Sequence, residues 1–194
     1  MAEPESRPEH EELWRFSLAF YDQPGVAEVL IALQDRDGRN VNLVLFALWL
    51  GISGRGSLDS GLLAAAAQTA DALGSEIVEP LRALRRKLRD HPDGDVQKLR
   101  EAVKAVELAG EKLIQQRLAR LSLPPRISMP PADRAAAACT NLALYLRPEG
   151  VRTSEAAVIR TALDAFALAS EGRASVRSLA GETAVRRRKL HPTA

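Results

Sequence analysis

The chain is poor in the residues that build most covalent and metal sites. Of 194 residues, one is cysteine and three are histidine. A single cysteine excludes an internal disulfide and any metal site made from several cysteines. Cys139 lies in the run AAAACTNLALYL, where a small buried thiol fits well. We therefore expect a structural thiol in a reducing, cytoplasmic setting.

The three histidines also lack the surroundings that nucleophilic catalysis needs. His10, His91 and His191 fall in a predicted lead, a turn and a tail, and none lies on a rigid apolar element beside a nucleophile. The acidic turn at 90–95 lacks calcium-loop spacing, and turn and capping chemistry explain its residues. We expect no catalytic residue and no metal ligand, and the sequence favours a protein that is not an enzyme.

The glycine-rich loop after the most apolar segment does not match a phosphate-binding loop. Gly51, Gly56 and Ser57 match the frame of a phosphate-binding loop, but no lysine follows the second glycine. The apolar segment before it is predicted to be a helix instead of the strand that such a loop requires. We therefore expect a plain interhelical loop and no cofactor.

Long apolar runs are also missing. The most apolar run, 41–52, holds 12 residues and includes Asn42 and Gly51, whereas a membrane span needs about 20. The N-terminal MAEPESRPEHEE is acidic and proline-bearing, unlike a signal peptide. We expect no membrane span and no signal peptide.

The net charge of the chain is small, but the charged residues are unevenly distributed along it. The formal net charge is +2, yet residues 1–123 carry 16 basic against 19 acidic side chains, and residues 124–194 carry 11 against 6. This asymmetry makes the C-terminal part the place to expect an acidic partner such as nucleic acid.

What the chain does have is apolar spacing typical of helices. The spacing predicts a helix from residue 13 to the breaker DQPG, a second at 26–33, and an all-round apolar helix from 41 that belongs at the centre of a bundle. The run LLAAAAQTADAL predicts a further helix, and Pro80 either kinks this helix or lies in the first turn of the helix that follows it. Asp95 is the predicted cap of a long spine helix at 96–121, whose expected seam is Val96, Leu99, Val103, Val106, Gly110 and Leu113.

A proline-rich stretch divides the chain. SLPPRISMPP contains four prolines in ten residues, and two further amphipathic helices follow it. The predicted fold is all-α, a helical bundle with a long spine helix, a C-terminal helix pair and a mobile basic tail. The predicted organisation is a disordered lead at 1–10, a bundle domain at 11–123, a linker at 124–131, the helix pair at 132–170 and the tail at 171–194.

A stripe of cations marks the helix EPLRALRRKLR. Its members recur at i, i+3, i+4 and i+7 beside a leucine stripe, and are Arg82, Arg85, Arg86 and Arg89. Glu79 can pair with Arg82, and Glu107 and Glu111 of the spine helix could face Arg85 or Arg86. An arginine rim around an apolar stripe also fits a protein or anion partner. The first functional hypothesis is a non-enzymatic adaptor or regulatory protein that binds a protein partner on this face.

Aromatics are few but clustered, because six of the eight lie between Trp14 and Trp49. They suit the core of a bundle. The alternative is a pocket, with one of the arginines adding polarity, formed by Trp14, Tyr21, Asn42 and Trp49. That alternative makes a small-molecule-binding bundle the third hypothesis.

The segments RISM, GVRT and SEAAVIRTALDAF resemble a ribbon-helix-helix DNA-binding module. The resemblance implies a dimer in which Arg126 and Ser128 face DNA, and the basic tail would add phosphate contacts through Arg186, Arg187, Arg188 and Lys189. The motif spacing is stretched by two residues, and flanking prolines shorten any strand. The alternative is two amphipathic helices that complete the bundle, with Thr153 as an N-cap. A dimeric DNA-binding transcriptional regulator is therefore the second hypothesis.

A wider resemblance covers residues 12–121. LWRFSLAFYDQPGVAEVLIALQDRDGRNVNLVLFALWLG, followed by EIVEPLRALRRKLR, resembles a family of short, uncharacterised bacterial helical proteins of unknown function. The shared features include the Leu-Trp start, the Pro-Gly stop and the Pro-Leu-Arg helix. The resemblance implies a helical domain in the bacterial cytoplasm and implies no activity.

Overall fold

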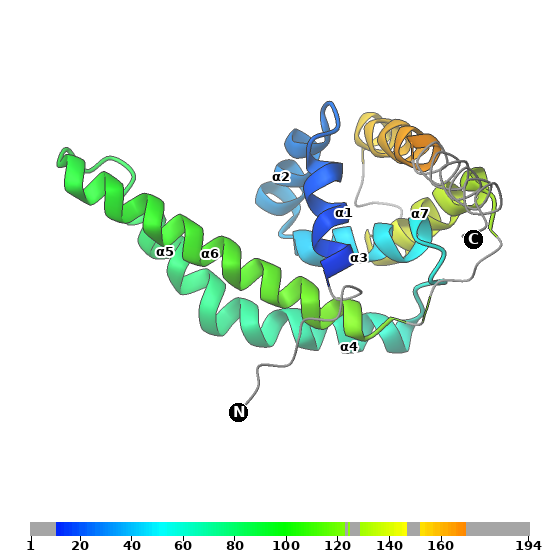
Figure 1. Cartoon of the computed structure of the whole chain (residues 1–194), viewed down its shortest axis with the longest axis horizontal. Coiled ribbons are helices and arrows are strands. Elements are labelled where there is room, and N and C mark those ends of the chain that lie inside the picture. Colours follow the sequence, from blue (N-terminus) through cyan, green and yellow to red (C-terminus); the bar gives the residue numbers. More distant parts are fainter. Residues whose placement is uncertain (1–10, 123, 125–128, 147–151, 170–194) are drawn as a thin grey trace, which may run out of the picture.

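The fold is all-α, as predicted. A computed structural model describes residues 11–122, 124, 129–146 and 152–169, and every regular element in these residues is helical (Figure 1). The elements are α1 (Glu12–Tyr21), α2 (Val26–Asp37), α3 (Val41–Ile52), α4 (Ser60–Leu73), the π-helix η2 (Gly74–Val78), α5 (Glu79–Lys87), α6 (Gly94–Arg120), α7 (Pro131–Leu146) and a last helix at 153–169.

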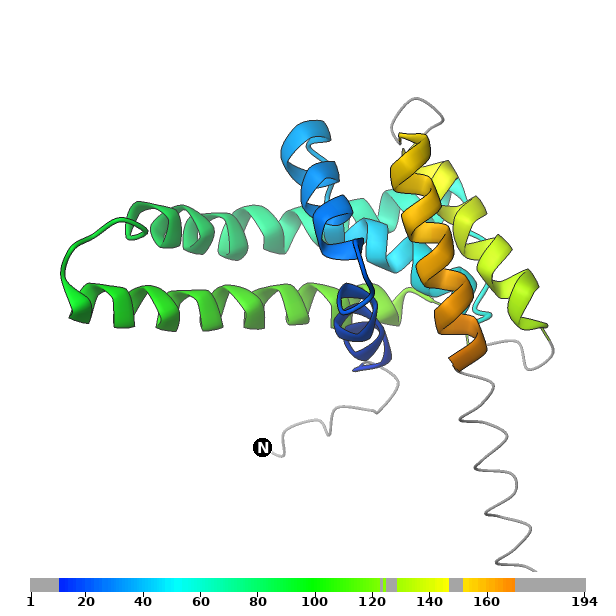
Figure 2. The ribbon, with the colours of Figure 1, turned by 90° about the horizontal axis from the view of Figure 1, so that it is seen from above.

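The molecule consists of a helical bundle and a hairpin that projects from it. α4, η2 and α5 follow one another as one rod, and α6 returns antiparallel beside it (Figures 1 and 2). Pro80 does not break this rod because it is the second residue of α5, where its missing N–H costs little. The far part of the hairpin extends beyond the bundle, and accordingly α5 has no buried residue.

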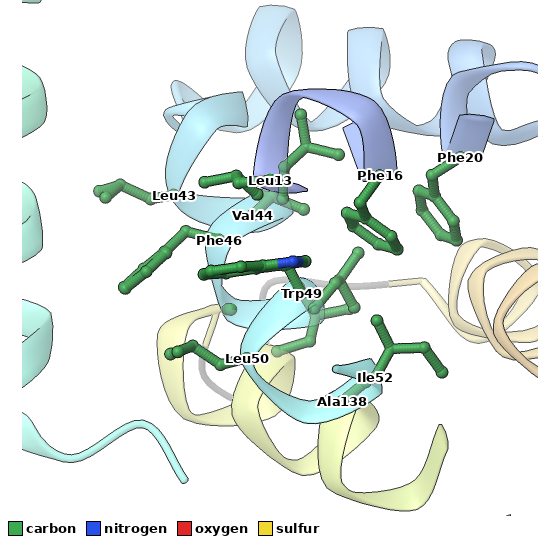
Figure 3. Close-up of a cluster of buried hydrophobic side chains, with 14 of the residues drawn as sticks. Leu13, Phe16, Phe20, Leu43, Val44, Phe46, Trp49, Leu50, Ile52 and Ala138 are labelled. Carbon is green, nitrogen blue, oxygen red and sulfur yellow. The ribbon is translucent and has the colours of Figure 1, made fainter. Parts of the chain in front are cut away.

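The helix α3 forms the centre of the core, as its apolar sequence predicted. Every residue from Leu43 to Ile52 is buried, and the ring of Trp49 lies among side chains from α1 and α3 (Figure 3). The Asn40 side chain caps this helix by accepting a hydrogen bond from the Asn42 backbone N–H at 3.0 Å. Within the described residues, no helix combines the length and apolar character that crossing a bilayer requires.

The helices α3 and α7 cross in very close contact. A Cβ on Gly51 would lie 2.2 Å from the backbone nitrogen of Ala138, so only glycine fits there. One turn along α7, the buried Asn141 accepts a hydrogen bond from the Leu58 N–H at 2.8 Å and donates to the carbonyl of Gly56 at 3.1 Å. These contacts fix the loop after α3 against α7.

The last helix joins the same core as the N-terminal helices. Ile159 and Leu163 are buried in the cluster that contains α3, and Phe16 meets Phe166 edge to face with ring centroids 5.2 Å apart. The carboxylate of Glu155 accepts from Arg36 of α2 at 2.6 Å. The last helix therefore belongs to the core that surrounds α3.

Two predicted helix ends differ from the structure. α2 continues to Asp37, four residues beyond the expected end, and stops at Gly38, which adopts a left-handed backbone conformation. α6 is capped by Asp93, whose side chain accepts from the Asp95 N–H at 2.8 Å, so Asp95 was the wrong cap. Short acidic turns offer several cap candidates, and the chain path decides which carboxylate meets the free N–H groups.

The expected cap of the last helix is also different. Thr153 is already helical, and the Glu155 carboxylate accepts from the Arg152 N–H at 3.1 Å. This is the glutamate half of a capping box, in which the third helical residue satisfies the residue before the helix. Glu155 thereby serves both the cap and the ion pair to Arg36.

The predicted seam of α6 was largely wrong. Of its members, Val103 and Gly110 are buried, whereas Leu99, Val106 and Leu113 are exposed. The buried face is formed instead by Val103, Glu107, Gly110, Ile114, Gln115, Leu118 and Ala119. A seven-residue pattern drifts around an α-helix, and here the helices that α6 contacts select the neighbouring face.

The Gly51 contact generates a stability prediction. We expect Gly51→Ala to lower the free energy of unfolding by about 3 kcal/mol or more, because its methyl group would meet the α7 backbone, which must move. The matched control is Gly74→Ala, where a Cβ meets nothing within 4 Å. This control should be neutral or stabilising by up to about 1 kcal/mol. Urea unfolding measures both, and equal stabilities would contradict the close crossing.

Candidate ligand pocket between the bundle and the hairpin

A pocket of about 590 Å³ lies where the bundle meets the hairpin. One wall comes from α1, the second from the turn between α2 and α3, and the third from η2, α5 and α6. The side chains that give it its chemistry are Trp14, Tyr21, Arg39, Asn42, Arg82 and Glu111. Its volume falls within the range of known small-molecule sites, about 300–1,000 Å³.

A chain of hydrogen bonds fixes the bundle side of the pocket. The Ser17 hydroxyl donates to Oε1 of Gln115 at 2.8 Å, and Nε2 of Gln115 donates to Oδ1 of Asn42 at 2.9 Å. Ser17 and Gln115 are buried, so these hydrogen bonds hold α1, α3 and α6 together. The amide nitrogen of Asn42 has no hydrogen-bond partner among the described residues and is left as a donor.

The hairpin side carries a network of arginines and glutamates. Arg82 donates to Glu107 at 3.1 Å and to Glu111 at 2.7 Å, and Arg85 donates to Glu107 at 2.5 Å. Burial would raise the pKa of Glu107, but the hydrogen bonds from Arg85 and Arg82 outweigh it and hold the pKa below its usual value. Glu107 is therefore a carboxylate at neutral pH.

Two other titratable groups at the pocket shift in the opposite direction. Burial raises the pKa of Glu111, and the neighbouring Glu107 adds to the increase. Burial also raises the pKa of Tyr21 to about 12, with a further contribution from Glu111. The Tyr21 hydroxyl consequently stays protonated at neutral pH and can donate a hydrogen bond to a ligand.

The structure gathers most of the residues of the predicted pocket. Trp14, Tyr21 and Asn42 line it, together with Arg82 from the predicted arginine face. Trp49 lies elsewhere, 3% exposed in the core, with the guanidinium of Arg55 4.6 Å from its ring centroid. Arg55, which lies within the glycine-rich loop, therefore packs on an aromatic side chain.

The arginine face divides into two parts. Arg82 and Arg85 are half-buried against the glutamates of α6. Arg86 and Arg89 are exposed and form no ion pair with any described residue. The two arginines that can meet a partner are therefore the ones nearer the tip of the hairpin.

The DNA-contact residues of the ribbon-helix-helix resemblance lie outside the described residues. These are Arg126, Ser128, Arg186, Arg187, Arg188 and Lys189. In the described part of that segment, Ile159, Ala162 and Leu163 are buried in the core of this chain. The apolar face of the last helix is thus occupied within the same molecule.

The environments of Cys139 and His91 fit structural roles. Burial raises the pKa of the Cys139 thiol, so it stays protonated. Nδ1 of His91 accepts from the Asp93 N–H at 3.2 Å in the turn between α5 and α6. Among the described residues, no group of three or more histidine, cysteine or acidic side chains is placed to hold a metal ion.

Two features of the pocket are difficult to predict from sequence patterns. The π-helix η2 contributes Gly74 and Val78 to the lining, and such segments are frequent at functional sites. Its signal was a glycine shortly before Pro80. Arg39 was missed because its position depends on α7, where it donates to the Leu146 carbonyl at 3.3 Å.

The arginine–glutamate network generates a pH prediction. A carboxyl whose folded pKa lies below its unfolded value stabilises the fold above the unfolded pKa, near 4.5 for Glu107, and this stability is lost as the pH falls through the folded pKa. We expect Glu107→Gln to lower the free energy of unfolding at pH 7 by about 1–3 kcal/mol. The difference from wild type should shrink as the solution is acidified below the unfolded value.

The control for this prediction is Glu76→Gln, an exposed glutamate of the same hairpin. It should change stability by less than about 0.5 kcal/mol at any pH, because exposed charges contribute little. Denaturant unfolding at several pH values measures both variants. A Glu107→Gln effect that is independent of pH would contradict the role assigned to the carboxylate.

Comparison with known proteins places the chain in a family. No curated protein and no solved structure matches it. The sequence pattern of the family described as protein of unknown function (DUF2390) matches residues 12–118. This span includes every residue that lines the pocket, and it ends within α6. It also confirms the resemblance drawn from the sequence: the chain belongs to the DUF2390 family.

Proposed function

We propose that the protein binds a small polar organic molecule in the pocket between the bundle and the hairpin. The observation that carries this proposal is the convergence of three separate elements on one cavity of about 590 Å³. They supply an aromatic wall, a fixed amide donor and an arginine–carboxylate pair. Apolar surface with a few oriented polar groups is the usual composition of a small-molecule site.

The chemistry of the walls indicates the class of ligand. The bundle side offers the donors of Tyr21, Asn42 and Arg39, which suit an acceptor such as a carboxylate. The hairpin side offers the carboxylates of Glu79 and Glu111, which suit an amine or hydroxyl donor. We therefore expect a small carboxylic acid that also bears amino or hydroxyl groups.

The setting of this function is proposed to be the bacterial cytoplasm. The single cysteine is a partly buried, protonated thiol. Proteins without disulfides are typical of reducing compartments. A ligand of the proposed class would be a soluble metabolite of that compartment.

A second candidate function is the adaptor role, with a protein partner on the hairpin. It is supported by two exposed arginines: Arg86 near the end of α5, a helix that buries none of its side chains, and Arg89 in the turn that follows this helix. Exposed arginines beside apolar surface are common in protein interfaces. Reversing both charges should abolish capture of such a partner, whereas reversing Lys104, an exposed cation of α6, should not. Capture that survives the double reversal would exclude this surface.

The ligand proposal predicts a thermal shift. We expect one or more members of a panel of amino acids and hydroxy acids to raise the melting temperature by about 5 °C when present at roughly a hundred times its dissociation constant. Differential scanning fluorimetry of the full chain measures this. Leu108→Trp should remove the shift, because Leu108 lines the pocket and is 49% exposed, so a larger side chain can fill the mouth without entering the core.

The matched control is Leu144→Trp, which changes a leucine that is 55% exposed on α7 and does not line the pocket. It should keep the full thermal shift. A direct readout is available from tryptophan emission, since Trp14 lies in the pocket wall and Trp49 in the core. A shift that persists in Leu108→Trp, or an absence of any shift across the panel, would count against the proposal.

A further inference from the structure

The helix α6 has an exposed apolar stripe that neither the core nor the pocket uses. Leu99, Val106 and Leu113 are 54%, 54% and 37% exposed. They recur every seven residues, so they lie almost in line over about 21 Å of helix. Between them the helix presents three small exposed side chains, Ala102, Ala105 and Ala109.

The stripe faces away from the pocket. Four residues of α6 line the pocket, namely Leu108, Glu111, Gln115 and the buried Ile114, and none of them belongs to the stripe. Leu108 lies two residues beyond Val106, which is about 200° around the helix. The ligand site and the stripe therefore occupy opposite faces of α6, and a partner on the stripe would leave the pocket open.

We propose that this stripe is the interface of a homodimer, in which α6 of one copy packs antiparallel against α6 of a second copy. The large and small residues of the stripe are complementary to themselves in that arrangement. In the antiparallel heptad register, Leu113 of one copy meets Ala102 of the other, and Val106 meets Ala109. Alanines opposite larger side chains let the two helices approach closely.

The charges beside the stripe favour the same orientation. Glu101 and Lys112 lie on the same flank of α6, with side chains 58% and 36% exposed, and each also forms an ion pair within its own copy, Glu101 with Arg100 and Lys112 with Glu11. An antiparallel pair brings Glu101 of one copy near Lys112 of the other. In a parallel pair this flank would face the opposite flank of the partner, so Glu101 and Lys112 would not meet.

The shape of the molecule agrees with this orientation. The bundle lies at the end of the hairpin where α6 finishes, and the other end projects (Figures 1 and 2). Antiparallel pairing puts the two bundles at opposite ends of the dimer. Parallel pairing would bring both bundles to the same end, where they would compete for space.

Analytical ultracentrifugation of the full chain tests the interface. We expect wild type to be a dimer at micromolar concentrations and Val106→Lys to weaken dimerisation at least about tenfold, because it buries an unpaired charge. The matched control is Ile31→Lys on α2, where an aliphatic side chain is 53% exposed away from α6. This variant should dimerise like wild type. A monomeric wild type, or equal effects of the two substitutions, would overturn the proposal.

The register has its own test. Ala102→Glu and Leu113→Lys should each weaken the homodimer, whereas an equimolar mixture should form a heterodimer in which the new glutamate meets the new lysine. Circular dichroism of each variant checks that the helices are retained. A mixture no tighter than the separate variants would overturn the antiparallel register. This result does not depend on the ligand proposal, since no residue of the stripe lines the pocket.

Discussion

The helix α3 has no polar face and must be enclosed by other helices on every side. Twelve residues long, it buries everything from Leu43 onward, and α1, α2, α7 and the base of the hairpin provide the cover. The closest contact is the crossing at Gly51, where a side chain would meet the backbone of α7. Enclosing α3 in this way also fixes its first turn, because the Tyr145 hydroxyl of α7 accepts from the Asn40 N–H at 3.1 Å. The pocket wall formed by this turn therefore depends on α7.

The hairpin is held together by a different kind of interaction. Its outer helix buries no side chain, so the hydrophobic effect contributes little there. Arg82 and Arg85 instead meet Glu107, a buried carboxylate. Partly buried ion pairs add modest net stability but are costly to leave unpaired, and so they fix how α5 lies on α6. The pocket forms at the junction of these two kinds of packing, where apolar and charged side chains necessarily meet.

The family match and the core do not have the same limits. The match ends at residue 118, within α6, yet α7 and the last helix contribute Ala138, Leu142, Ile159 and Leu163 to the core that surrounds α3. In this chain the C-terminal helices therefore complete the family domain. α6 connects the proposed functions, because one face lines the pocket and the opposite face carries the apolar stripe.

Local patterns in the sequence determined the helical fold, the central position of α3 and the pairing of the arginine helix with Glu107 and Glu111. Spacing along a helix is enough to predict these features, because it fixes which side chains share a face. The sequence could not show that Trp14 would line a pocket while Trp49 entered the core, since both are aromatic and lie on apolar helices. Nor could it choose the buried face of α6, where Glu107 and Gln115 are inside while Leu99 is outside. Only tertiary structure decided these points, because burial depends on which helices cover a face, and those helices are remote in sequence.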